Sequence, residues 1–190
     1  MSRRIVLTLL VPLVAVATMR PAFAQQGVTE LGFDMALAYE TESESFSVSL
    51  PIGGVLNSLL APPGGLRAGF FLSDVTSLEP SLSVAYLALN GSDNPLAISS
   101  ALKLLYHLSS DPDRTRAYIG VGPSFLYVKD GEQDSSQFGV LGELGLKIPI
   151  AQRVGTRMAA GFMHGFDSDD FSERNMIYLT AGLSVFLGGD

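Results

Sequence analysis

The residues best suited to acid–base chemistry gather around one histidine. His164 is followed by Asp167, Ser168, Asp169 and Asp170. A histidine beside a carboxylate can activate a serine hydroxyl or a water molecule, so this segment could serve an enzyme. However, the chain has no G-x-S-x-G or H-E-x-x-H pattern, and acidic clusters are common in solvated loops. We therefore predict no catalytic residues and expect that the chain is not an enzyme.

Two acidic segments have the oxygen ligands that a hard cation prefers. They are DGEQD, from Asp130 to Asp134, and DSDD, from Asp167 to Asp170. Such loops could hold Ca²⁺ or bridge divalent cations to lipopolysaccharide, but DSDD lacks the glycine and distal glutamate of an EF-hand loop. Solvated charge explains both segments, and we predict no metal site and no cofactor.

A third set of charged residues alternates with large apolar residues along the chain. If these charges share the inside of a closed sheet, opposite charges should pair there, because an unpaired buried charge is costly. We predict an interior polar network with a structural role; the alternative is a gated or narrow conduit through it. The set comprises Glu30, Asp34, Arg67, Glu79, Lys103, Arg116, Glu143, Lys147 and Arg157.

The elements that position these charges are predicted from a hydrophobic period of two. Between Glu30 and Glu40 the odd positions are large and apolar, whereas the even positions are small or charged. The same pattern recurs to the end of the chain in runs of about 9–14 residues. Strands of soluble sheets average about five or six residues, and a tilted transmembrane strand needs about 9–11. Run length therefore favours a barrel in a membrane.

The connections alternate between short turns and longer or more acidic loops, as in transmembrane barrels with periplasmic turns and exposed outer loops. Three turns and four loops require eight strands, with both ends of the barrel chain in the periplasm. The predicted fold is all-β: an eight-stranded, up-and-down antiparallel transmembrane barrel. The predicted turns are 73–76, 109–114 and 151–155, and the predicted loops are 41–45, 90–95, 129–136 and 166–175.

Residues 54–65, rich in Gly and Pro, interrupt this pattern. We assign the alternating pieces on either side to one second strand, broken by a bulge, a short helix or a rim excursion. If each piece were a full strand, the count would be nine and the alternation of loops would fail.

The N-terminus predicts export. Arg3 and Arg4 precede an apolar run, and Ala22-Phe23-Ala24 forms a small-residue cleavage site. We predict that residues 1–24 are a cleaved signal peptide and that residues 25–190 form one barrel domain. The remaining 166 residues would carry nine basic against 19 acidic side chains, a net charge of −10, which argues against nucleic acid as a partner. The chain has no Cys, which excludes disulfides and thiolate metal sites.

The predicted mature chain resembles the small eight-stranded outer-membrane barrels of the outer-membrane protein A/X-like group. The resemblance rests on FFLSDVTSLEPSLS (70–83), AYIGVGPSFLYV (117–128), GELGLKIPI (142–150) and the terminal AGLSVFL (181–187). It implies the barrel fold, the outer membrane as location and recognition by the barrel assembly machinery. The residues after Phe186 depart from the usual C-terminal assembly signal.

Roles within this group differ widely, so the resemblance implies architecture more than function. We expect a structural or surface-interaction role, with outer-membrane lipid and lipopolysaccharide as neighbours and a monomeric barrel. Three alternatives stay open: a narrow porin-like conduit for small solutes, an outer-membrane lipid-modifying enzyme, and a soluble periplasmic lipocalin-like carrier.

Overall fold

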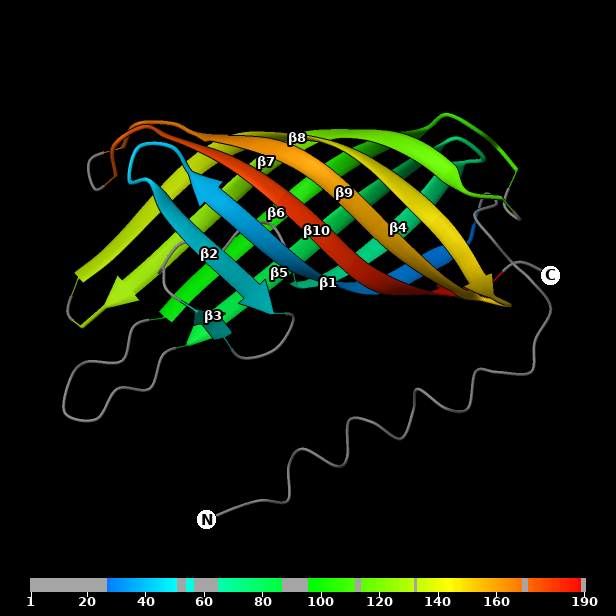
Figure 1. Ribbon diagram of the computed structural model, residues 1–190, viewed down its shortest axis with the longest axis horizontal. Coiled ribbons are helices and arrows are strands. Elements are labelled where there is room, and N and C mark those ends of the chain that lie inside the picture. Colours follow the sequence, from blue (N-terminus) through cyan, green and yellow to red (C-terminus); the bar gives the residue numbers. More distant parts are fainter. Residues whose placement is uncertain are drawn as a thin grey trace, which may run out of the picture.

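The computed structural model shows long antiparallel strands that close into a barrel (Figure 1). It describes residues 27–50, 54–56, 65–86, 96–111, 114–131, 133–168 and 171–188. The predicted signal peptide lies outside the described residues. The strands are β1 (Thr29–Glu40), β2 (Ser45–Leu50), β3 (Gly54–Leu56), β4 (Gly65–Ser73), β5 (Thr76–Tyr86), β6 (Leu96–His107), β7 (Arg116–Asp130), β8 (Gln133–Ala151), β9 (Val154–Gly165) and β10 (Arg174–Leu187).

Eight of these strands form the closed ring. The pairing runs from β10 through β9, β8, β7, β6, β5 and β4 to β1, and β1 pairs again with β10. All the pairings are antiparallel, and the closing one extends from Thr29↔Leu187 to Glu40↔Met176. The prediction of an eight-stranded, up-and-down antiparallel barrel is confirmed.

The second strand of the barrel is interrupted, as the sequence predicted. The first half of β1 pairs with β4, from Thr29↔Phe70 to Asp34↔Gly65. Its second half pairs with β2, from Ala36↔Ser49 to Glu40↔Ser45. The short β3 turns back along β2 between these two pieces. Residues 51–53 and 57–64 of the interruption lie outside the described residues.

Three of the connections show how the chain reverses between strands. Asp74-Val75 and Gln152-Arg153 form the tight turns between β4 and β5 and between β8 and β9. The predicted outer loop 129–136 is wrong, because β7 and β8 stay paired up to Asp130↔Gln133. Gly131 has φ 62°, a left-handed conformation that lets the chain reverse within a tight turn. The predicted loop 90–95 lies outside the described residues.

The alternation along the strands separates an apolar outer face from a polar inner face. On β9, Met158 and Phe162 are exposed, whereas Arg157 and Met163 are buried. His164 lies at the end of the same strand on the outward side, as its position in the alternation predicts. None of the described residues forms a helix long and apolar enough to cross a membrane.

Candidate functional site: the barrel interior

The centre of the barrel holds four carboxylates and four cationic side chains, all of them buried. They come from six strands, and none is more than 6 % exposed. Each strand contributes them from its inward-facing positions, so the closed sheet brings together residues that are up to 127 positions apart in sequence. The eight are Glu30, Asp34, Arg67, Glu79, Lys103, Glu143, Lys147 and Arg157. We call this set the charge network.

Arg157 on β9 is fully buried at the middle of the charge network. Its Nη1 and Nη2 atoms donate to Glu79 Oε1 and Glu143 Oε1, both at 2.5 Å. Lys103 joins the same two carboxylates, with its Nζ 2.8 Å from Glu79 Oε1 and 3.2 Å from Glu143 Oε1. Two cations therefore share two carboxylates, which offsets much of the cost of burying all four charges.

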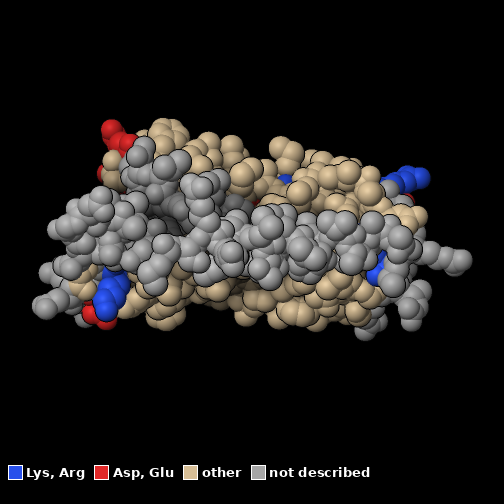
Figure 2. Space-filling view, turned by 90° about the horizontal axis from the view of Figure 1, so that it is seen from below, with Lys and Arg blue, Asp and Glu red and all other residues tan. Residues whose placement is uncertain are grey.

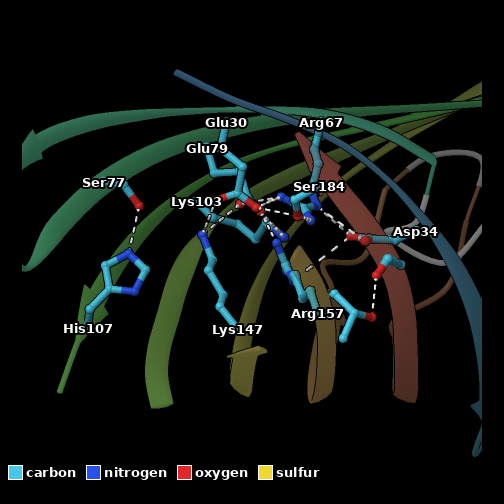
Figure 3. A network of polar contacts seen from close by, with 12 residues as sticks. Glu30, Asp34, Arg67, Ser77, Glu79, Lys103, His107, Lys147, Arg157 and Ser184 are labelled. Carbon is cyan, nitrogen blue, oxygen red and sulfur yellow. Dashed lines mark hydrogen bonds and ion pairs between the residues drawn. The ribbon is translucent and has the colours of Figure 1, made fainter. Parts of the chain in front are cut away.

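Glu30 on β1 organises the second half of the charge network (Figure 3). It accepts hydrogen bonds from Arg67 Nη1, from Lys147 Nζ at 2.5 Å and from Ser184 Oγ at 2.7 Å. Arg67 also donates through Nε to Asp34 Oδ2 at 3.0 Å. Arg67 Nη1 lies 3.5 Å from Glu79 Oε2, which links the two halves.

Inward-facing glycines make the room that these large side chains need. Gly32 pairs with Arg67, Gly145 with Tyr118 and Gly161 with Tyr178 across neighbouring strands. A Cβ atom on Gly145 would lie 2.4 Å from Tyr118 Cζ, and one on Gly32 would lie 2.6 Å from Arg67 Cζ. These distances are shorter than any van der Waals contact. The register of the sheet thus sets a glycine opposite a long side chain.

The loop-side half of the interior contains an apolar cluster. Its six side chains are Ala, Leu, Met and Tyr residues from five strands. Arg174, near the outer end, donates to Gln137 Oε1 through Nε and Nη2, at 2.8 and 2.6 Å, and pairs with Glu40. Its guanidinium also lies over the ring of Phe171. The cluster is Ala38, Ala101, Leu141, Met163, Met176 and Tyr178; we call it the apolar layer.

The turn-side end of the interior combines aromatic and cationic side chains. His107 makes a 3.1 Å hydrogen bond with Ser77 (Figure 3). Its ring also stacks on that of Phe71. Arg116 lies with its guanidinium carbon 5.8 Å from the centre of the Phe71 ring. Unlike the eight residues of the charge network, Arg116 forms no ion pair with any described carboxylate.

The pockets lined by described interior residues near the two ends are narrow. One, near Arg174 and Gln137, and another, near Arg116 and Lys147, each have about 10 Å³ open to a water-sized sphere. That is room for about one water molecule. An eight-stranded barrel is just wide enough for side chains to fill it, and here long polar side chains do so.

The rim residues that could have supported catalysis do not converge. His164 Nδ1 lies 3.0 Å from Asn175 Oδ1, and no hydrogen bond or ion pair joins it to Asp167 or Ser168. Ser168 Oγ instead donates to the carbonyl of Ser136. Asp169 and Asp170 lie outside the described residues. In the part of the chain that the structure describes, no group of three or more His, Asp or Glu side chains could hold a metal ion.

The rim is instead held by a carboxylate–amide contact. Glu42, in the turn after β1, accepts hydrogen bonds from the backbone N–H and the Nδ2 atom of Asn175, both at 2.8 Å. These bonds favour the ionised carboxylate and lower the pKa of Glu42 to about 2. Thr41 N–H donates to the Asn175 carbonyl, so the turn after β1 is fastened to the start of β10.

The outer wall carries a continuous apolar surface. Leu31, Phe33, Met35 and Leu37 on β1 are each 37–50 % exposed, and every other strand of the ring has exposed apolar side chains. In the face shown in Figure 2, charged side chains gather mainly at the two ends of the barrel. Contiguous apolar surface on this scale is not stable in water, whereas a closed barrel with an apolar belt is stable in a bilayer.

The fold is shared with solved structures of outer-membrane proteins, although sequence comparison finds no relative. No family model and no curated protein matches the chain. Neisserial surface protein A has a TM-score of 0.56 at 14 % identity, over 83 % of this chain and 95 % of that one. The outer membrane protein OprG from Pseudomonas aeruginosa has a TM-score of 0.52 at 11 % identity, over 88 % and 99 %.

A third structure, of the outer membrane protein AlkL, has a TM-score of 0.52 at 15 % identity, over 90 % of this chain and 95 % of that one. This chain has the fold of the small eight-stranded outer-membrane β-barrels. The apolar belt and the closed sheet accordingly assign it to the outer membrane, with the polar interior shielded from lipid.

Sequence reasoning named nine of the eleven buried charges among the described residues, but it missed Glu40, Arg174 and the neutral partners of the charge network. Ser184 bonds both Arg67 and Glu30, and Tyr178 donates to Glu143 Oε2 at 3.3 Å. Both residues occupy inward-facing positions of β10 that alternate with exposed Leu and Ile residues, and this alternation was the sequence signal for them. The glycines opposite long side chains were missed because cross-strand register cannot be read from a single strand.

Proposed function

We propose that this chain is a non-conducting outer-membrane barrel with a structural and surface-interaction role. Its interior serves as a polar core that stabilises the barrel, and its rim presents short acidic segments to the outside. In this proposal the barrel is a monomer, has outer-membrane lipid and lipopolysaccharide as neighbours, and is inserted by the barrel assembly machinery after removal of residues 1–24. It performs no catalysis.

The observation that carries the proposal is the charge network. A conduit needs a continuous polar path, yet Arg157 and Lys103 bridge the same two carboxylates across the centre of the barrel. Opening a path there would separate buried charges, which costs several kcal/mol per ion. Above the network, the apolar layer would have to part as well, and its residues are at most 8 % exposed.

The alternatives differ in what they require of the described residues. A lipid-modifying enzyme would need a nucleophile beside a histidine that lipid can reach, and the polar partners of His164 are Asn175 and Glu173. Ser77 does bond to His107, but both side chains are fully buried inside the barrel. A soluble carrier would need a cavity inside the barrel and a polar outer wall, whereas this wall is apolar. A conduit would need the central charge network to separate.

The location of the barrel in the outer membrane and the absence of a solute path through it can be tested separately. Membrane fractionation with heat-dependent gel mobility should place the full-length chain in the outer-membrane fraction as a heat-modifiable barrel; recovery in the periplasmic fraction would contradict the proposal. Liposomes containing the refolded protein should swell no faster in small sugars than empty liposomes do. Swelling at the rate of a general porin would favour the conduit.

A further inference from the structure

Buried charge is unbalanced at the turn-side end of the barrel. Among the described residues the interior holds five buried carboxylates and six buried cations. Ten of these charges take part in ion pairs; the remaining one is Arg116. The carboxylates are Glu30, Asp34, Glu40, Glu79 and Glu143, and the cations are Arg67, Lys103, Arg116, Lys147, Arg157 and Arg174.

The surroundings of Arg116 leave part of its hydrogen-bonding capacity unused. The residue is 3 % exposed, and no described group accepts a hydrogen bond from its Nη1 atom. The contact that it does make is with the face of the Phe71 ring, which can satisfy a cation only in part. A buried guanidinium without an anion is costly, and protein interiors avoid one.

Arg116 also lines a narrow pocket that opens between the ends of β7, β8, β9 and β10. Lys147, Thr156, Ser184 and exposed Arg114 line the same pocket. Lys147 is already paired with Glu30, and Thr156 donates to the Gly182 carbonyl, so the unused hydrogen-bonding capacity belongs to Arg116. Arg114, at the entrance, is 82 % exposed and pairs with Asp111, with its Nε atom 3.1 Å from Asp111 Oδ2.

We propose that this pocket is a binding site for a carboxylate group that enters from the turn side of the barrel. A guanidinium can hold a carboxylate through charge-assisted hydrogen bonds. The open space of about 10 Å³ is that of about one water molecule, so one carboxylate oxygen would take that place and the rest of the ligand would lie at the entrance. The inference rests on the barrel and its orientation, but not on whether the barrel conducts.

The first test compares two buried arginines without any ligand. R116Q should leave the urea midpoint of the refolded full-length barrel unchanged or raise it, because an unpaired buried charge is removed. R67Q should lower the midpoint clearly, because Glu30 and Asp34 lose their partner. If R116Q lowers the midpoint as much as R67Q, Arg116 is already paired within the chain and the proposal is overturned.

The second test measures binding directly by NMR of the arginine Nε–H signals in detergent micelles. Acetate, titrated against chloride at constant ionic strength, should shift the Arg116 signal along a saturating curve. R116Q should weaken acetate binding at least about tenfold, whereas R114Q, a change at the entrance, should weaken it less. An unaffected Arg116 signal, or equal binding to R116Q, would overturn the site.

Two further arms identify the source of the carboxylate. Triglycine with a free C-terminus, compared with its amidated form, tests whether a peptide end is preferred over acetate; selective binding of the free form supports a peptide ligand.

Wild type is also compared with D113N and with a chain that ends at Gly188. If acetate binds only to one of these variants, the chain supplies its own anion and the proposal of an external ligand fails.

Discussion

The inside of the barrel is built in two different ways along its axis. In the charge network, eight ionised side chains fill the lumen and hold one another by hydrogen bonds. In the apolar layer, Ala38, Leu141, Met163 and their neighbours are held mainly by apolar packing, and Tyr178 also donates a hydrogen bond to Glu143. The charge network fixes which side chain meets which, whereas the apolar layer tolerates repacking.

The two regions differ in the kinds of side chain that fill them. In and beside the charge network, long side chains such as Arg67 and Tyr118 lie opposite Gly32 and Gly145, which leave space for them. The apolar layer consists of Ala, Leu, Met and Tyr side chains that pack against one another. The comparison predicts that damage to the charge network costs more and spreads further than damage to the apolar layer.

The largest effect should come from Arg157→Met. It leaves Lys103 as the one cation that Glu79 and Glu143 share in a buried site, so we expect a loss of about 3–5 kcal/mol in the free energy of unfolding. Urea unfolding in lipid vesicles measures it. The matched control adds E143Q alone, which restores the balance of buried charge and leaves Lys103 paired with Glu79, and it should restore part of the loss. If R157M alone unfolds like wild type, the charge network does not stabilise the barrel.

A smaller loss is expected from Leu141→Ala in the apolar layer. Leu141 is 2 % exposed, and its truncation should cost about 2–4 kcal/mol through lost burial and a residual cavity. Leu141→Met keeps the volume and should cost less than about 1.5 kcal/mol. The same unfolding assay applies. Equal losses in L141A and L141M would mean that this region is not packed by shape.

The pairing of an inward-facing glycine with a long side chain on the next strand can be tested at Gly145 and Tyr118. Gly145→Ala places a Cβ atom against the ring of Tyr118 and should cost about 1–3 kcal/mol by overpacking. Tyr118→Leu in the same chain removes the clash, so G145A should then be nearly neutral. Gly142→Ala is the control, because its nearest neighbour is a backbone oxygen 3.9 Å away. Additive losses in the G145A/Y118L variant would contradict this pairing.

The smallest effect concerns the rim. The pKa of Glu42 in the folded barrel is about 2, below its ordinary value of 4.5. The ionised carboxylate therefore stabilises the rim above about pH 4.5, and this contribution disappears as the pH falls through 2. NMR of the Asn175 side-chain amide should show a transition near pH 2 that E42Q abolishes. A transition near pH 4.5 would mean that the Glu42–Asn175 contact is not formed in solution.

The fold could be predicted in detail because each residue of a membrane barrel meets either lipid or the interior. The alternation around Phe33 and Met158 therefore fixed both the face and the strand. Register could not be predicted: the pairing of Gly145 with Tyr118 depends on two strands at once. The loop 129–136 was misjudged because acidic side chains suggested solvent, whereas Gly131 allows the ladder to continue to Asp130↔Gln133.

The interior was predicted only in part for the same physical reason. The alternation along each strand identified which charged side chains face inward, including Arg157 and Glu79. It did not identify which of these side chains would contact one another. Charge alone also predicted a partner for Arg116, and none of the described carboxylates supplies one. Pairing depends on height along the barrel axis, which the strand tilt and the interruption between β2 and β4 determine.

The most direct test of the closed interior is conductance in planar bilayers. The chain without residues 1–24 should insert without discrete current steps. R157A, which lacks one of the two cations that join Glu79 and Glu143, should conduct intermittently if it still folds. R116Q serves as the control, since it removes a buried arginine outside the charge network and should stay silent. Regular, discrete conductance of the wild-type protein would contradict the account.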